Sequence, residues 1–104
     1  MKRNPKKYNQ YKETRCKACG HDGSFYPLDI DHVATFKAHP ELAYDKRNLL
    51  TVCRKCHVLK GQKGTSYMAE AYPAVRNFLI ANGWYYCELS KKWRLENIKF
   101  TQAD

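Results

Sequence analysis

Two Cys-x-x-Cys pairs constrain this chain more than any other feature of its sequence. Cys16 and Cys19 form the first pair, and Cys53 and Cys56 form the second. Because a tight turn can present two thiolates to one ion, two such turns fit the tetrahedral coordination shell of zinc. Four sulfur ligands leave no open position for water or substrate, so we expect a structural zinc ion. Buried cysteines without a metal are the alternative, which this regular spacing disfavours.

A metal that staples the fold also suits the composition. The 104 residues suffice for one compact domain, but eight Tyr and two Trp supply much of the hydrophobic content of 43%, and aliphatic residues are sparse. A domain with so little aliphatic core usually needs a metal or disulfides. Since no apolar stretch follows the basic N-terminus, we expect no secretory signal and a cytoplasmic, intracellular protein, in which paired cysteines more often bind metal.

The balance of charge indicates a polyanionic partner. Nineteen Lys and Arg against ten Asp and Glu give a formal net charge of +9. No apolar run reaches the roughly 18 residues of a membrane-spanning helix, and no basic amphipathic helix is evident, so a membrane partner is disfavoured. Nucleic acid, bound mostly through its phosphates, is the expected partner.

The chain divides into three expected segments. Residues 1–15 carry six basic residues and one acid, which predicts a flexible basic arm, either a solvated tail or a polycation that lies along nucleic acid. Residues 16–64 contain the motifs and should form the zinc-stapled core. Residues 65–104 are expected to pack on that core as one helix followed by an aromatic β-hairpin.

Within the core, residues 25–33 are predicted to be the second arm of a short hairpin, with Pro27 at an edge position. An irregular loop is predicted from about residue 34 to residue 47. Residues 48–64 are predicted to be a turn that enters a short helix, which ends near Gly61 or Gly64.

In the C-terminal segment, Pro73 is typical of a helix start and Asn82–Gly83 of a helix end. The hairpin is predicted from residues 84–89 and 93–98. Cys87 is expected to be a small core residue in this hairpin. The aromatic side chains are also expected to form a small core rather than to stack on bases, and they are Trp84, Tyr85, Tyr86 and Trp93.

An ordered set of polar residues lies between and beside the cysteine pairs. Asp31 and His32 occur in LDIDHV, Asn48 occurs in KRNLLTV, and His57 directly follows Cys56. Together with the cysteines, this string resembles the HNH endonucleases of the His-Me finger or ββα-metal group, in particular the small zinc-knuckle members found in phages and bacteria. The resemblance covers about 45 of the 104 residues. It implies an α+β fold class: a small zinc-stabilised ββα-metal domain, here with a C-terminal helix and β-hairpin.

The resemblance implies a role for each polar residue of this set. His32 would be the general base that activates water, and Asn48 would hold the loop that orients its ring. Asp31 and His57 would bind a catalytic divalent ion; so open a site favours Mg²⁺ or Mn²⁺, and the His ligand also permits Ni²⁺ or Zn²⁺. Gly61 stands where some members carry a further metal-binding His, so only two protein ligands are expected.

Local geometry bears on these roles in two ways. Adjacent residues on a helix point about 100° apart, so Cys56 can face the zinc while His57 faces a second ion. Asp31 and His32, in contrast, would point to opposite faces of a regular strand. We therefore expect the strand to end or bulge at this pair.

Basic residues on or after the predicted short helix are candidates for phosphate contacts, and they are Arg54, Lys55, Lys60 and Lys63. Phosphate contacts position a protein without reading sequence, so we expect little sequence specificity and strong salt dependence. His21 and His39 have no motif partners and are expected at the surface, although His21 is close enough to the first cysteine pair to replace a zinc ligand.

The leading functional expectation is a metal-dependent endonuclease that nicks DNA or cuts both strands. The alternative is a non-catalytic zinc-ribbon protein that binds nucleic acid, which the charge and the four cysteines suit equally well. A nuclease that acts on RNA or on single strands is a third reading. Only the set of Asp31–His32, Asn48 and His57 separates the first expectation from the second.

Overall fold

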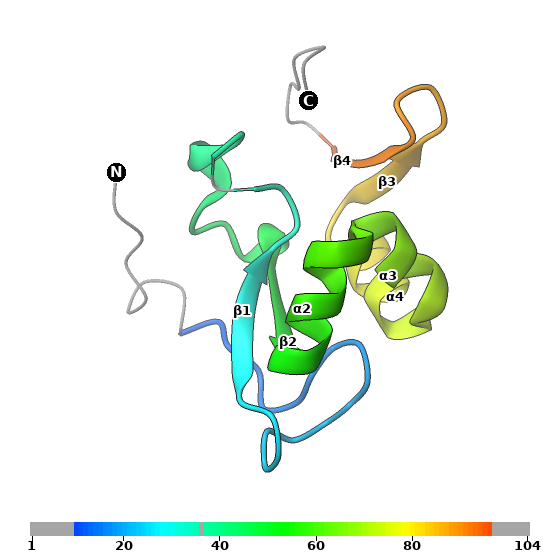
Figure 1. Cartoon of the computed structure of the whole chain (residues 1–104). Coiled ribbons are helices and arrows are strands. Elements are labelled where there is room, and N and C mark those ends of the chain that lie inside the picture. Colours follow the sequence, from blue (N-terminus) through cyan, green and yellow to red (C-terminus); the bar gives the residue numbers. More distant parts are fainter. Residues whose placement is uncertain (1–9, 36, 97–104) are drawn as a thin grey trace.

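The structure, a computed structural model, describes residues 10–35 and 37–96 (Figure 1). This part of the chain contains three helices and two separate two-stranded antiparallel sheets, which confirms the α+β class. None of these helices is long and apolar enough to cross a membrane. In chain order the elements are β1 (Leu28–His32), the 3-10 turns η1 (Pro40–Leu42) and η2 (Lys46–Asn48), β2 (Leu49–Cys53), α2 (Arg54–Lys63), α3 (Thr65–Ala71), α4 (Pro73–Ala81), β3 (Trp84–Cys87) and β4 (Lys92–Leu95).

The first sheet pairs β1 with β2 in a regular antiparallel register, from Leu28 opposite Cys53 to His32 opposite Leu49. The prediction that residues 25–33 are the second arm of a hairpin was wrong, because β1 pairs with the strand that follows it and residues 10–27 contain no strand. That segment instead bends into a turn, in which the N–H of Cys16 donates to the carbonyl of His21 over 2.8 Å.

Strand β2 was also missed by the sequence analysis, which placed its residues in a turn that leads into a helix. All five residues of β2 are buried. A strand buried on both faces lacks the alternation of polar and apolar residues by which a strand is recognised in sequence. The helix itself was predicted correctly: α2 follows β2 directly and ends at Lys63, where Gly64 adopts the positive φ of 91° that favours glycine.

Helices α3 and α4 lie beside α2, on the side toward the C-terminal hairpin (Figure 1). The predicted start at Pro73 and the end before Asn82 are confirmed for α4. Helix α3 was not predicted; it has seven residues and buries Met68 and Ala69. It is too short for the apolar periodicity of a helix to repeat, so its sequence carries little signal.

The C-terminal hairpin pairs β3 with β4 and is shorter than predicted; residues 97 and 98 lie outside the described part of the chain. Trp84 is buried, and its indole N–H donates to the carbonyl of Arg47 over 2.7 Å. Trp93 packs against the core, as expected. The same expectation was wrong for Tyr85 and Tyr86, which are exposed.

The hydrophobic core joins the first sheet to the C-terminal elements. Its buried members come from β2, from the three helices and from both strands of the hairpin, and include Leu50, Val52, Cys56, Met68, Val75, Leu79, Trp84 and Leu95. Cys87 does not belong to this cluster and is half-buried near the hairpin turn, so the prediction that it is a core residue was wrong. The two cysteine pairs therefore contribute to the same core that supports the hairpin.

Candidate active site and zinc centre

The four paired cysteines meet at one point. Their Sγ atoms all lie within 4.8 Å of one another, and those of Cys19 and Cys53 are 3.7 Å apart. Zinc–sulfur bonds of about 2.3 Å in a tetrahedron place sulfur atoms about 3.8 Å apart. The two turns that carry the pairs are brought together by β2, because Lys17 donates its N–H to the carbonyl of Thr51 over 2.8 Å. The cluster could therefore hold one zinc ion.

The surroundings of the thiols favour a cation at their centre. Burial disfavours the charged form of Cys16, but donation from the backbone N–H groups of Cys19, Cys53 and Ala18 outweighs it and lowers the pKa of Cys16 to about 7. Burial and the neighbouring thiols raise the pKa of Cys56. The protein thus favours one thiolate by itself, whereas a metal ion would be needed to ionise Cys56.

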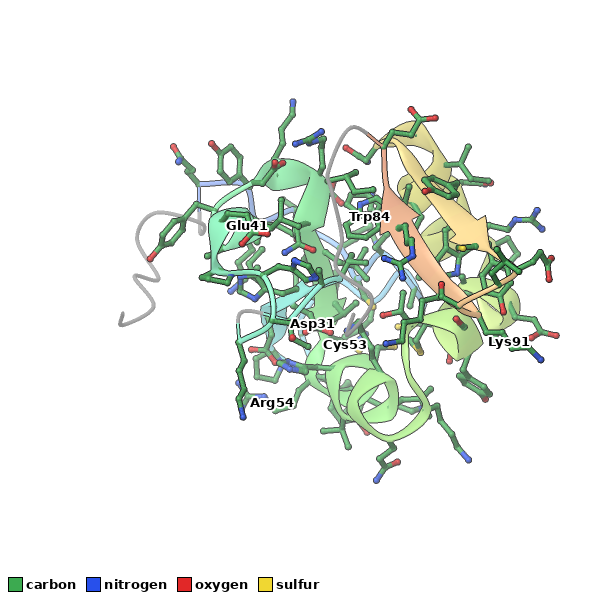
Figure 2. All side chains as sticks on the ribbon, turned by 90° about the horizontal axis from the view of Figure 1, so that it is seen from above. Asp31, Glu41, Cys53, Arg54, Trp84 and Lys91 are labelled. Atoms are coloured by element: carbon green, nitrogen blue, oxygen red, sulfur yellow. The ribbon has the colours of Figure 1, made fainter. Side chains whose placement is uncertain are left out.

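Two carboxylates of β1 face α2. Asp29 and Asp31 are two residues apart on the strand and so project from the same face. Figure 2 shows Asp31 near the centre of the molecule, close to α2, whereas Arg54 points outward. The side chains that meet these carboxylates come from α2, and they are Arg54, His57 and Lys60. The backbone N–H of His32 also donates to the Oδ1 atom of Asp31 over 2.9 Å.

Asp31 and His57 are brought together by this arrangement. The Nε2 atom of His57 lies 3.9 Å from the Oδ1 atom of Asp31, and the His57 side chain is 45% exposed. The other carboxylate oxygen of Asp31 lies 3.2 Å from the ammonium of Lys60, which is only 11% exposed and also donates to the carbonyl of His32 over 3.1 Å. Asp31 is therefore held in place while the His57 edge of the pair remains open to solvent.

His32 leaves the strand on the opposite face from Asp31. The strand does end at His32, as predicted, with a regular register up to its last residue. The ring is buried, with 6% of the residue exposed, and its Nε2 atom lies 2.9 Å from the carbonyl oxygen of Ala43. A carbonyl only accepts, so this contact requires the proton to be on Nε2 and puts the lone pair of the neutral ring on Nδ1.

Asn48 is fully buried at the end of η2 and ties the long loop between β1 and β2 to the sheet. Its Oδ1 atom accepts the N–H of Ala34 over 2.6 Å, and its Nδ2 atom donates to the carbonyls of Ala34 and Leu42, each over 3.1 Å. Leu42 immediately precedes Ala43, whose carbonyl contacts His32. The amide of Asn48 therefore fixes the backbone that fixes the His32 ring.

Asp29 is a site residue that the sequence analysis missed. Its Oδ2 atom lies 3.5 Å from the Nδ1 atom of His57, and hydrogen bonds from Arg54, the nearest cation, lower the pKa of its carboxyl. The signal was present in the alternation of LDIDHV, since a residue two positions before Asp31 shares its face of the strand. It is weak, because an acid on a strand is more often solvated than functional.

The predicted phosphate-binding residues differ in their surroundings. Lys55 and Lys63 are exposed, and Arg54 is exposed but paired with Asp29. Lys60 is nearly buried and contacts Asp31 and His32, as described above. The exposed cations lie on the helix that carries His57, so the positive charge of α2 adjoins the candidate site.

The two histidines outside the motif behave differently from each other. His21 is half-buried, and its Nε2 atom accepts the N–H groups of Phe25 and Tyr26, so that nitrogen supports the turn after the first cysteine pair. The four-residue metal cluster found in the described chain does not include it. The expectation that His39 lies at the surface was wrong: it is buried, with its Nδ1 atom 3.0 Å from Glu41.

A comparison with protein families agrees with this geometry. Residues 16–63, which contain both cysteine pairs and all the polar residues of the motif, match the family model described as HNH endonuclease. Comparisons with curated proteins and with solved structures gave no match. The resemblance noted in the sequence is thereby confirmed. Residues 16–63 of this chain therefore carry the pattern of the HNH endonuclease family.

Proposed function

We propose that this chain is a metal-dependent endonuclease that hydrolyses phosphodiester bonds of DNA. The observation that carries the proposal is the approach of His57 and Asp31, whose Nε2 and Oδ1 atoms lie 3.9 Å apart across α2 and β1. An imidazole and a carboxylate at this distance, one edge open to solvent in a basic domain, suit a divalent ion and a bound phosphate.

The two ligands fit a hard divalent ion. With metal–ligand distances of about 2.1 Å, neighbouring ligands of an octahedral ion lie about 3.0 Å apart and opposite ligands about 4.2 Å apart. Asp31 and His57, at 3.9 Å, could therefore share an ion after a shift of less than about 1 Å. Two protein ligands leave the remaining positions for water and phosphate, which favours Mg²⁺ or Mn²⁺. Such an ion would stabilise the charge that develops on the phosphate and supply an acidic water to the leaving oxygen.

His32 is proposed as the general base. Donation from its Nε2–H to Ala43 leaves Nδ1 as the atom that takes the proton from the attacking water. Because Asn48 holds both ends of the loop that carries Ala43, the ring is oriented before substrate binds. Lys60 holds the carbonyl of His32 and the carboxylate of Asp31 at once, so we assign it a positioning role beside its predicted contact with phosphate.

The alternative function, a non-catalytic zinc-ribbon binder, explains the cysteine cluster and the charge but gives no role to the remaining groups. Asp29, Asp31 and His57 gather on one side of the sheet, and Asn48 and Lys60 are committed to holding their neighbours. A binder would gain more phosphate affinity without two carboxylates beside its basic helix. The arrangement therefore favours the nuclease.

Incubation of the purified, zinc-loaded protein with supercoiled plasmid tests the proposal directly. We expect relaxed circles in the presence of Mg²⁺ or Mn²⁺ and none after chelation of the added ion. His57→Ala should lose this metal-stimulated nicking because it removes one of two ligands, while His21→Ala, outside the pair, should retain it. Plasmid that is bound and retarded but never cut, under all these conditions, would favour the non-catalytic binder.

Asp29→Asn tests how His57 is oriented. The carboxylate of Asp29 lies near Nδ1 and would hold a proton there, directing Nε2 toward Asp31. Loss of such a partner typically weakens metal binding about 10- to 100-fold. We expect a loss of Mn²⁺ affinity in that range, measured by calorimetric titration of Mn²⁺ into the DNA-free protein. Arg54→Ala removes the ion pair but keeps the carboxylate, so it should retain most of the affinity. An equal loss in both variants would contradict the orienting role.

A further inference from the structure

A pocket of about 400 Å³ lies beside the candidate active site, and of the predicted phosphate-binding residues it includes Lys63. One wall is the start of the loop after β1, another is the junction of α2 and α3, and the third is strand β4 of the hairpin. Neither His32 nor the Asp31–His57 pair lines it. Its volume is within the range of about 300–1,000 Å³ that is typical of small-ligand pockets.

The lining of this pocket has the chemistry of a nucleotide site. Cations come from two separate elements, Lys63 at the end of α2 and Lys92 and Arg94 in β4, and the lining contains no Asp or Glu. Hydroxyl groups from Thr35, Thr65 and Ser66 add hydrogen-bonding partners. Positive charge combined with hydroxyl groups suits a phosphate and a sugar.

Trp93 supplies an aromatic surface to the same pocket. It is half-buried and packs against the core, and its ring is in edge contact with Tyr86, with centroids 5.9 Å apart. Arg94 is oriented by the hairpin turn, since its Nε–H donates to the hydroxyl of Ser90 over 3.2 Å. Trp93 and Arg94 are neighbours on β4, so the indole and the guanidinium project from opposite faces of the strand, but both residues border the pocket. An aromatic ring for the base together with a cation for the phosphate is a common combination in nucleotide sites.

The pocket adjoins the candidate active site along the chain at two points. Val33, in its lining, directly follows His32, and Lys63 lies three residues after Lys60 on α2. A strand whose phosphate reaches the Asp31–His57 pair can therefore continue into the pocket. Bases of an intact duplex remain stacked and paired, so only an unpaired nucleotide can bring its base against Trp93.

We propose that this pocket binds one unpaired nucleotide of the DNA strand, close to the phosphate that is cut. The inference rests on the proposed nuclease function and specifies its substrate class: DNA with a single-stranded segment beside the cleavage site, such as a gap or a flap. The hairpin then serves as the element that selects this DNA, and the HNH domain as the element that cuts it.

The experiment compares the affinity of the full chain for two labelled DNAs of one sequence, a continuous duplex and the same duplex with a short gap. Fluorescence anisotropy is measured without added divalent ion, so that no cleavage occurs. We expect tighter binding of the gapped DNA. Lys63→Ala combined with Arg94→Ala should reduce that preference about tenfold, since the contacts of one nucleotide contribute on this scale.

Arg76→Ala combined with Lys91→Ala is the matched control, because both residues are exposed, lie outside the pocket and carry the same total charge. This control variant should bind both DNAs more weakly by the same factor and keep the preference for gapped DNA. Lys63→Ala alone, at the exposed end of α2, provides a second test if the double variant unfolds. Equal affinity of the wild type for both DNAs, or an equal loss of preference in the control, would overturn the proposal.

The same measurements separate this inference from the nuclease proposal. If the protein cuts plasmid but does not prefer gapped DNA, the nuclease proposal stands and the pocket proposal is rejected. If the protein prefers gapped DNA through Lys63 and Arg94 but never cuts DNA, the pocket proposal stands and the nuclease proposal is rejected.

Discussion

His32→Ala should lower the rate of metal-dependent plasmid nicking by about 10²- to 10⁴-fold, the usual contribution of a general base. The variant removes the Nδ1 atom proposed to take a proton from water, while the groups that would hold the metal remain on the other face of β1. Zinc content and DNA affinity should therefore stay close to those of the wild type. The measurement is the initial rate of conversion of supercoiled to relaxed plasmid, with zinc and DNA binding measured on the same preparation.

The burial of His32 calls for a second variant. Alanine leaves a small cavity and removes the partner of the Ala43 carbonyl, which could loosen the loop. His32→Gln keeps a donor that can reach this carbonyl but cannot act as a base. We expect it to restore the melting temperature and not the activity. Nicking by His32→Gln at the wild-type rate would remove His32 from the mechanism.

The features predicted correctly from the sequence are those whose determinants are local. Each Cys-x-x-Cys pair specifies a turn, and the two turns meet in one four-cysteine cluster that could hold an ion. Helix α4 is bounded by Pro73 and Asn82, which act on the backbone at their own positions. The same holds for the end of α2 at Gly64, where the positive φ favours glycine.

The features that were missed depend on the tertiary fold. Strand β2 is buried on both faces, so its sequence shows no alternation, and the hairpin partner of β1 was consequently assigned to the wrong side. His39 looked like a surface residue because its partner, Glu41, approaches only through the turn at Pro40. Tyr85 and Tyr86 looked like core because aromatic composition does not say which positions of a hairpin are covered.

The candidate site divides in the same way. Asp31, His32, Asn48 and His57 could be identified by their order and by family resemblance. Asp29 was indicated only weakly and the internal use of Lys60 not at all, because both depend on how α2 lies across β1. The pocket was equally inaccessible to sequence reasoning, since its walls come from three segments that share no motif. The residues that support the site take their roles from how the elements pack, which sequence does not show. The residues proposed to carry out the reaction are chosen for their chemistry and can be recognised by residue type and order.

Cys53→Ser should abolish tight zinc binding and unfold the domain at ordinary temperatures. Structural zinc contributes about 10–16 kcal/mol to the folding of zinc-finger peptides, which equals or exceeds the total stability of about 5–15 kcal/mol of most small domains. Three of the four ligands, Cys16, Cys53 and Cys56, are also members of the buried core. Loss of the ion would therefore leave ionisable groups inside the core as well as two turns that are no longer joined through their sulfur atoms. Metal analysis and circular dichroism during heating measure both effects.

Cys87→Ser is the matched control, because Cys87 is the one cysteine outside the cluster. It should bind one zinc ion per chain and melt as the wild type does. Chelation of the wild type provides a test without any substitution: a strong chelator should unfold the protein, and added zinc should refold it. A cooperative thermal transition in zinc-free protein would show that the aliphatic and aromatic core is enough to fold the domain without the metal. In that case the contact between α2 and β1, and with it the site formed by Asp31 and His57, would not depend on the metal.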